Sequence, residues 1–276
     1  MKLVRWGDKG SERPGIVDGN GHVRDLSGHC TDLTPEMLHP DRLDRLRRVD
    51  PATLPPAPAG ARLGVPVAGI PNIVAIGLNY RDHAAEVTMK LPSEPVVFSK
   101  HTGSLAGPED PLSYPEETAK LDWEVELGVV IGRPTWQVPE SAALSHVAGY
   151  LTANDISARD WQIDRGGQWV KGKSGPGFCP LGPWLVTADE VADPQGLSLW
   201  CAIDGKRKQD GATADMVFGV AFLIAYVSRF LTLMPGDVLL TGTPPGVGLG
   251  RGEFLKKGSL IEAAVDGLGR QQVRVV

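Results

Sequence analysis

The sequence has few of the residues that mark disulfide-rich or zinc-binding proteins. It contains 3 cysteines in 276 residues, Cys30, Cys179 and Cys201, and they lie far apart. An odd, scattered set supports neither a disulfide framework nor a closely spaced cysteine pair for zinc or redox chemistry. We therefore expect three ordinary reduced thiols.

An excess of positive charge is also missing. The 28 Lys and Arg residues are outnumbered by 33 Asp and Glu residues, which gives a formal net charge of −5 at pH 7. Binding to nucleic acid or to an anionic membrane surface needs clustered cations that neutralise phosphates. The composition therefore argues against those partners and favours a small molecule.

Long hydrophobic runs are scarce as well. The one run that approaches the length of a membrane span, Met216–Met234, is interrupted by Gly219, Ser228 and Arg229. Apolar residues around most of its circumference predict a helix over residues 214–233 that packs inside a core. The N-terminal residues lack the apolar segment of a secretory signal. Together these features predict a cytoplasmic protein without membrane contact.

Short β-type segments dominate what is present. Further helices are expected only near residues 82–87 and 139–145. Strands that outnumber helices, without regular alternation of the two, predict a β-rich α+β fold and argue against Rossmann and TIM-barrel architectures. The predicted strands are Lys2–Trp6, Ile16–Val17, Val23–Leu26, Ile73–Gly77, Val96–Phe98, Trp123–Ile131, Val147–Ala153, Trp184–Thr187, Leu197–Ile203, Val238–Thr241, Leu260–Val265 and Gln272–Val276.

Proline marks a boundary between two parts of the chain. Residues 51–71 contain six prolines with several Ala and Gly residues, a composition typical of a semi-rigid connector. We expect a small N-terminal β-rich lobe and this connector at residues 1–68, and the main domain at residues 69–276.

Two glutamates alternate with apolar residues in the segment 122–127 (DWEVEL). Because successive side chains of a strand point to opposite faces, Glu124 and Glu126 share one face. On so hydrophobic a strand, two carboxylates need a cation or a proton to neutralise them. The pattern fits either a metal site or the acidic outer face of a half-exposed strand.

A third carboxylate, Asp155, follows the apolar run Val147–Ala153 at the point where a strand gives way to a loop. Loop residues held by a sheet are common functional positions, although Asn-Asp is also ordinary turn chemistry. Three carboxylates with no His or Cys nearby suit a hard, oxygen-preferring ion, Mg²⁺ before Mn²⁺ or Ca²⁺.

A histidine and a glutamate form a second pattern. His83 and Glu86 lie three residues apart and share a face if residues 82–87 form a helix. A carboxylate beside an imidazole orients the ring and raises its basicity, so that the ring can take a proton from water. From the residues alone, the pair is either such a dyad or an incidental surface contact.

Four segments form an ordered set: residues 75–86 (AIGLNYRDHAAE), 122–132 (DWEVELGVVIG), 154–162 (NDISARDWQ) and 241–248 (TGTPPGVG). In this order they resemble the motifs of the fumarylacetoacetate hydrolase family, and they extend over nearly the whole region 70–276. The resemblance implies a mixed β-sandwich roll of the C-terminal type of this family, assembled as a homodimer, and it makes residues 69–276 the catalytic domain.

The resemblance also implies roles for individual residues. It places Mg²⁺, with Mn²⁺ or Ca²⁺ as alternatives, on three carboxylates, and water activation on a His–Glu dyad carried by a mobile loop. The implied metal ligands are Glu124, Glu126 and Asp155; the catalytic residues are His83, Glu86 and Lys173; and the substrate contacts are Arg159, Gln162 and Thr243. We further expect residues 82–92 to act as a lid.

The implied activity is hydrolysis of a carbon–carbon bond in a 2,4-dioxo acid, which yields a 2-oxo acid and a carboxylic acid. Similarity to acylpyruvate hydrolases and to members that act on diketo-deoxy sugar acids, such as the rhamnonate derivative, indicates the substrate class. Decarboxylation of an oxaloacetate-type acid and keto–enol isomerisation are the alternatives within the family. Outside it, a non-catalytic Ca²⁺-binding scaffold also explains an acidic cluster.

One segment departs from the family pattern. Many members carry Asp-Thr-Phe shortly after the catalytic lysine, whereas this chain has Pro176, Gly177 and Phe178 there. The departure removes a carboxylate and a hydroxyl from the neighbourhood of Lys173. It leaves the three expected metal ligands unchanged.

Overall fold

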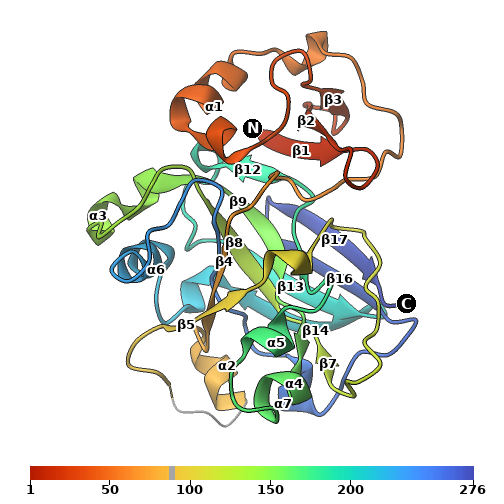
Figure 1. Ribbon diagram of the computed structural model, residues 1–276, viewed down its shortest axis with the longest axis vertical. Helices are drawn as coiled ribbons and strands as arrows, with labels where there is room; N and C mark the ends of the chain where they lie inside the picture. The colour runs from red at the N-terminus through yellow and green to blue at the C-terminus, as the bar shows by residue number, and fades with distance from the viewer. Residues whose placement is uncertain (87–90) are drawn as a thin grey trace.

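The computed structural model describes the backbone of residues 1–86 and 91–276, and the side chains of the same residues except 83–85 (Figure 1). Its largest element is a nine-stranded sheet. All neighbouring strands in this sheet are antiparallel except β15 and β4, which are parallel. The order is β3 (Val23–Asp25), β2 (Arg13–Val17), β1 (Lys2–Trp6), β12 (Leu185–Thr187), β9 (Val147–Asn154), β8 (Val125–Ile131), β15 (Val238–Leu240), β4 (Ile73–Gly77) and β5 (Val96–Lys100).

A second, antiparallel sheet of four strands covers part of the first. Its order is β14 (Lys206–Ala212), β13 (Ser198–Ile203), β16 (Leu260–Val265) and β17 (Gly269–Arg274). Strands β13 and β16 contact β8 in the large sheet, and β16 and β17 contact β9. Two short pairs complete the described strands: β6 (Leu105–Ala106) with β11 (Cys179–Pro180), and β7 (Leu121–Asp122) with β10 (Ser157–Ala158).

The helices are short and lie around the sheets (Figure 1). The α-helices are α1 (Pro40–Arg47), α2 (Arg81–Glu86), α3 (Glu140–Ala143), α4 (Arg159–Ile163), α5 (Val170–Lys173), α6 (Val220–Val227) and α7 (Gly248–Arg251). Single 3₁₀ turns occur at Pro35–Leu38, Pro51–Thr53, Thr102–Ser104, Leu144–His146, Ala188–Glu190 and Thr213–Asp215.

The large sheet separates two hydrophobic cores, and strand alternation decides which residues enter each. Along β8, Val125, Leu127 and Val129 pack in the core shared with the four-stranded sheet and α6. Val130, on the opposite face, packs in the core formed with the N-terminal residues and α1. Strand β8 is buried along its whole length, so it is a central strand with both faces covered.

The predicted β-rich α+β fold is confirmed, and each predicted strand has an observed counterpart with bounds that differ by a few residues at most. The division at residue 68 stays a prediction. In the structure β1 pairs with β12, so the N-terminal strands extend the same sheet that carries β8 and β9.

The predicted helix over residues 214–233 is wrong in length. The chain forms a 3₁₀ turn at Thr213–Asp215 and enters α6 only after the N-cap residue Gly219. Helix α6 ends at Val227, and the hydroxyl of its C-cap residue Ser228 donates to the carbonyl of Ala225 at 2.9 Å. In the described part of the chain, no helix is long and apolar enough to cross a membrane.

We expect Leu127→Ala to lower the free energy of unfolding by about 2–5 kcal/mol, because the leucine is fully buried between the two sheets. Leu144→Ala is the matched control, since that leucine is 41% exposed. Urea unfolding followed by circular dichroism measures both. Equal losses in the two variants would contradict this description of the core.

Candidate metal and substrate site

The ladder between β8 and β9 brings the three predicted carboxylates together. Glu126 lies opposite Ala153 in this antiparallel pair, and the backbone N–H of Asp155 donates to the carbonyl oxygen of Glu124 at 2.8 Å. Carboxylate oxygens of Glu124, Glu126 and Asp155 lie within 4.8 Å of one another. These residues are 5%, 1% and 0% exposed, which excludes an acidic outer face on a half-exposed strand.

Basic side chains from three other elements bond to this cluster. Lys173, at the end of α5, donates to Glu124 at 2.7 Å and to Asp155 at 2.6 Å. Arg159, at the start of α4, bonds to Glu124 and donates to Asp122 at 2.7 Å. Lys100, at the end of β5, forms a fully buried ion pair with Asp155.

The pKa values of Glu126 and Lys173 are both raised in the folded protein. Protonation removes the charge of Glu126 but gives Lys173 its charge. Burial, together with the negative charges of Asp155 and Glu124, raises the pKa of Glu126 well above the usual carboxyl value. The only bond to its side chain in the described part of the protein comes from the backbone N–H of Gly242, at 2.7 Å. For Lys173 burial works against the charged amine, but Asp155 and Glu124 outweigh it and raise the pKa.

The charges and the ligand types fit a divalent cation. In the described part of the site, four buried carboxylates face three cationic side chains, which leaves one negative charge in excess. Glu126 would carry this excess once ionised, because no cationic side chain in that part of the site bonds to it; without a cation its raised pKa favours the protonated form. Oxygen ligands without nitrogen or sulfur favour a hard ion over zinc. Glu124, Glu126 and Asp155 are therefore a candidate metal site.

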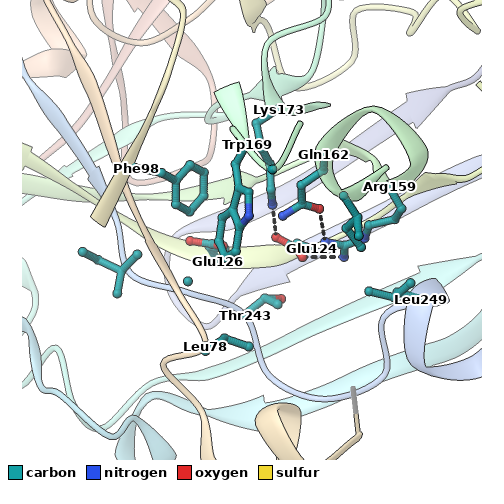
Figure 2. A pocket seen from close by; sticks show the side chains of 14 residues that line it. Leu78, Phe98, Glu124, Glu126, Arg159, Gln162, Trp169, Lys173, Thr243 and Leu249 are labelled. Atoms are coloured by element: carbon teal, nitrogen blue, oxygen red, sulfur yellow. Dashed lines mark hydrogen bonds and ion pairs between the residues drawn. The ribbon is translucent and has the colours of Figure 1, made fainter. Parts of the chain in front are cut away.

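Glu124 and Glu126 of this cluster line a cavity of about 230 Å³ (Figure 2). The predicted substrate residues Arg159, Gln162 and Thr243 all line it. The hydroxyl of Thr243 donates to the carbonyl of Val125 at 2.8 Å, and Gln209 donates to that hydroxyl at 2.7 Å. Thr243 thereby ties the glycine-rich loop to the first residue of β8.

The predicted dyad is described only in part. His83 belongs to α2, but its side chain lies outside the described residues. Glu86, at the end of α2, accepts a hydrogen bond from the backbone N–H of Gly246 at 2.8 Å, which links the helix to the glycine-rich loop. Within the predicted lid, residues 87–90 also lie outside the described residues.

Lys173 keeps ion-pair partners although the segment after it, residues 176–178, departs from the family pattern. Its two ion pairs come from Glu124 and Asp155, not from the following loop. The segment there closes a turn in which the N–H of Phe178 donates to the carbonyl of Gly175 at 3.0 Å. Gly177 has φ +80° in this turn, a value that favours glycine.

Sequence reasoning missed two charged residues of the site, Lys100 and Asp122. Asp122 accepts hydrogen bonds from the backbone N–H groups of Gly248 and Leu249 at 2.6 and 2.9 Å, and also binds Arg159. Its place beside Glu124 in the acidic segment could have drawn attention to it. No local pattern around Lys100 indicated a buried ion pair.

Comparison with known proteins assigns this arrangement to a class of enzymes. The family profile described as Fumarylacetoacetate (FAA) hydrolase C-terminal matches residues 72–276. A Burkholderia cenocepacia protein known only in general terms as a hydrolase is 55% identical over 274 residues, covering 98% of this chain and 97% of that protein. The chain therefore belongs to the fumarylacetoacetate hydrolase family, and its fold is the fold of that family.

Two solved structures support the same assignment. Fumarylacetoacetate hydrolase from Exiguobacterium antarcticum is 34% identical with a TM-score of 0.88, covering 100% of this chain and 99% of that one. Maleylpyruvate hydrolase from a Sphingobium species, in complex with manganese(II) and pyruvate, is 29% identical with a TM-score of 0.84 and the same coverage.

Glu126 has a higher pKa in the folded protein than in the unfolded chain. Its contribution to stability is therefore fully present at a pH below the unfolded pKa. That contribution is lost as the pH rises through the folded pKa. We therefore expect Glu126→Gln to raise the melting temperature of the metal-free protein at neutral pH and to weaken its decrease from acidic to neutral pH. The same variant should lose Mg²⁺ binding in calorimetry. Glu109→Gln, at an exposed position, is the control. Mg²⁺ affinity equal to that of the parent would rule out Glu126 as a ligand.

Proposed function

We propose that this protein is a Mg²⁺-dependent hydrolase that cleaves a carbon–carbon bond in a 2,4-dioxo acid, such as an acylpyruvate or a diketo-deoxy sugar acid. The observation that carries the proposal is the buried triad Glu124, Glu126 and Asp155, of which Glu124 and Glu126 line a cavity together with Lys173 and Arg159. A small 2-oxo acid is the expected ligand of such a cavity.

The carboxylate triad would hold the cation, and the cation, when bound, supplies positive charge that stabilises the enolate of the departing 2-oxo acid. In the proposed reaction, His83 takes a proton from water while Glu86 orients its ring, and the water oxygen attacks the C4 carbonyl carbon. The C3–C4 bond then breaks, its electron pair stays on C3, and C3 is protonated. The products are a 2-oxo acid and a carboxylic acid.

Lys173 suits stabilisation of the oxyanion that forms at C4. Two of the three N–H donors of its ammonium group bond to Glu124 and Asp155, so among the described residues one donor remains for a ligand in the cavity. The ion pairs keep the group charged and fix its position, as such a donor requires. Arg159 and Gln162 would contact the substrate from the same wall, where Arg159 donates to the Gln162 side chain at 3.1 Å.

Two reactions are alternatives in this family: decarboxylation of an oxaloacetate-type acid and keto–enol isomerisation. Neither requires an attacking water, so neither needs the His83–Glu86 pair as a base for water, whereas hydrolysis does. A non-catalytic Ca²⁺ scaffold is less favoured, because the acidic cluster lines a cavity and the family is one of enzymes. About six ligands near 2.1 Å would support Mg²⁺, and about seven near 2.4 Å would support Ca²⁺.

We expect His83→Ala to lower acylpyruvate hydrolysis roughly 10²–10⁴-fold, the usual contribution of a general base, and to lower oxaloacetate decarboxylation much less. Glu86→Gln should cost less than His83→Ala, because the amide still offers a hydrogen bond to the ring. Pyruvate release from both substrates, with and without Mg²⁺, gives the measurement. A parallel fall of the two activities, or decarboxylation alone in the parent, would favour the alternative.

We propose further that the protein assembles as a homodimer through the face formed by Phe222, Tyr226 and Phe230. The Phe222 and Tyr226 rings stack, Phe230 meets Tyr226 edge to face with ring centroids 5.2 Å apart, and Phe230 is 59% exposed. An exposed apolar face of this kind supports contact with a second protein surface.

We expect Phe230→Asp to convert a dimer into a monomer in size-exclusion chromatography with light scattering, because the new charge would lose its hydration at the interface. Val276→Asp, which is also at an exposed apolar position, should leave the dimer intact. A monomeric parent protein would end this proposal.

A further inference from the structure

The cavity has a polar and an apolar part. Glu124, Glu126, Arg159, Gln162 and Lys173 gather on one side, and Leu78 and Leu249 lie with Thr243 on the side away from Lys173 (Figure 2). The remaining apolar lining comes from Ile76, Phe98, Ile163 and Trp169. A ligand whose 2-oxo acid end contacts the charged wall would therefore extend its other end toward leucine side chains.

Leu78 occupies an unfavourable backbone conformation to reach this position. Its φ is +56°, in the left-handed region that leucine rarely adopts. The next residue, Asn79, is buried and holds the turn, since its side chain donates to the carbonyls of Phe218 and Thr241 at 3.0 and 2.8 Å. A glycine would adopt this conformation without strain. A leucine here therefore indicates that its side chain has a role in the cavity.

The other apolar residues are also fixed by their surroundings. A Cβ atom on Gly77 would lie 2.6 Å from the ring of Trp169, so the glycine makes room for this ring. The Phe98 and Trp169 rings meet edge to face with centroids 5.2 Å apart. The backbone N–H of Leu249 donates to Asp122 at 2.9 Å. Fixed neighbours therefore hold Leu249 on the side away from Lys173, and hold the Phe98 and Trp169 rings next to Lys173 (Figure 2).

The cations that line the described part of the cavity, Arg159 and Lys173, lie on its polar side, where they pair with carboxylates (Figure 2). Arg159 bonds to Asp122 and Glu124, and Lys173 bonds to Glu124 and Asp155. A second carboxylate at the far end of a ligand would lose hydration against leucine without gaining a charged partner among the described residues, which is unfavourable. Several hydroxyl groups would meet the same difficulty.

We propose that Leu78 and Leu249 form a specificity subsite that selects 2-oxo acids with an uncharged, apolar tail. The inference rests on the proposed function, because the charged wall must bind the 2-oxo acid end. It narrows the substrate class to acylpyruvates with an alkyl or aryl tail, and it disfavours dicarboxylic acids and polyhydroxylated sugar acids.

Binding of matched acids to the Mg²⁺-loaded protein, measured by calorimetry, tests the proposal without turnover. The tail of 5-methyl-2-oxohexanoate ends in two methyl groups where 2-oxoglutarate has two carboxylate oxygens, so the two acids share shape and differ in charge. We expect the branched acid to bind roughly 10–200-fold more tightly than 2-oxoglutarate and more tightly than pyruvate. A 3-deoxy-2-oxo hexonate should bind no better than pyruvate.

The variant Leu78→Gly tests the role of the Leu78 side chain in ligand specificity without a large loss of stability. Removing the side chain should weaken binding of the branched acid about tenfold or more, change pyruvate binding less than twofold, and cost little stability because glycine suits the positive φ. Gln137→Gly is the matched control, since Gln137 has φ +50° at an exposed position outside this cavity. It should leave the affinity of all the acids unchanged.

These binding measurements test the apolar subsite and the proposed function separately. Tight pyruvate binding with equal or stronger binding of 2-oxoglutarate would overturn the apolar subsite and leave the proposed function standing. An unchanged affinity of Leu78→Gly for the branched acid would overturn the role of Leu78. Failure of pyruvate and of all other acids to bind in the presence of Mg²⁺ would remove the proposed function and the subsite with it.

Discussion

The ion pairs around Glu124 and Asp155 are the interaction on which the arrangement of this site depends. Burying several carboxylates together is costly unless cations and hydrogen bonds compensate for lost hydration. Here the cations come from different elements: Lys100 from β5, Arg159 from α4 and Lys173 from α5. The docking of these elements against β8 and β9 is therefore tied to the charge balance, so that packing and site geometry depend on each other.

A strand that is buried on both faces has a nearly continuous run of apolar residues in the sequence. Much of the fold could be predicted because such runs are easy to recognise. This holds for Val125–Ile131 and Val147–Asn154. Strand β14 was missed because its sequence, KRKQDGA, is polar, although Gln209 within it is fully buried. The helix predicted over 214–233 was too long, since an apolar composition indicates that a segment is buried but does not indicate where a helix begins and ends.

The carboxylates of the site could be anticipated for a different reason. Glu124 and Glu126 stand in a strand too hydrophobic for unpaired charges, and that conflict is visible locally. Lys100 and Leu78 gave no such signal, because the role of Lys100 arises from a contact with a residue far away in the chain and that of Leu78 from a backbone conformation. The position of Lys173 likewise follows from its distant partners and not from the residues next to it.

The parallel pairing of β15 with β4 has a consequence for how the protein folds. It places the chain after residue 77 beside the chain after residue 240, and Asn79 bonds across this junction to the carbonyl of Thr241. Contacts between segments so distant in sequence form late, because closing a long loop costs conformational entropy before the contacts compensate. The cavity between these segments and β8 can exist only once the chain from residue 76 to residue 249, which supplies its lining, has folded. A partly synthesised or partly unfolded chain would therefore lack the complete pocket, and any ligand of the pocket would favour the fully folded chain by mass action.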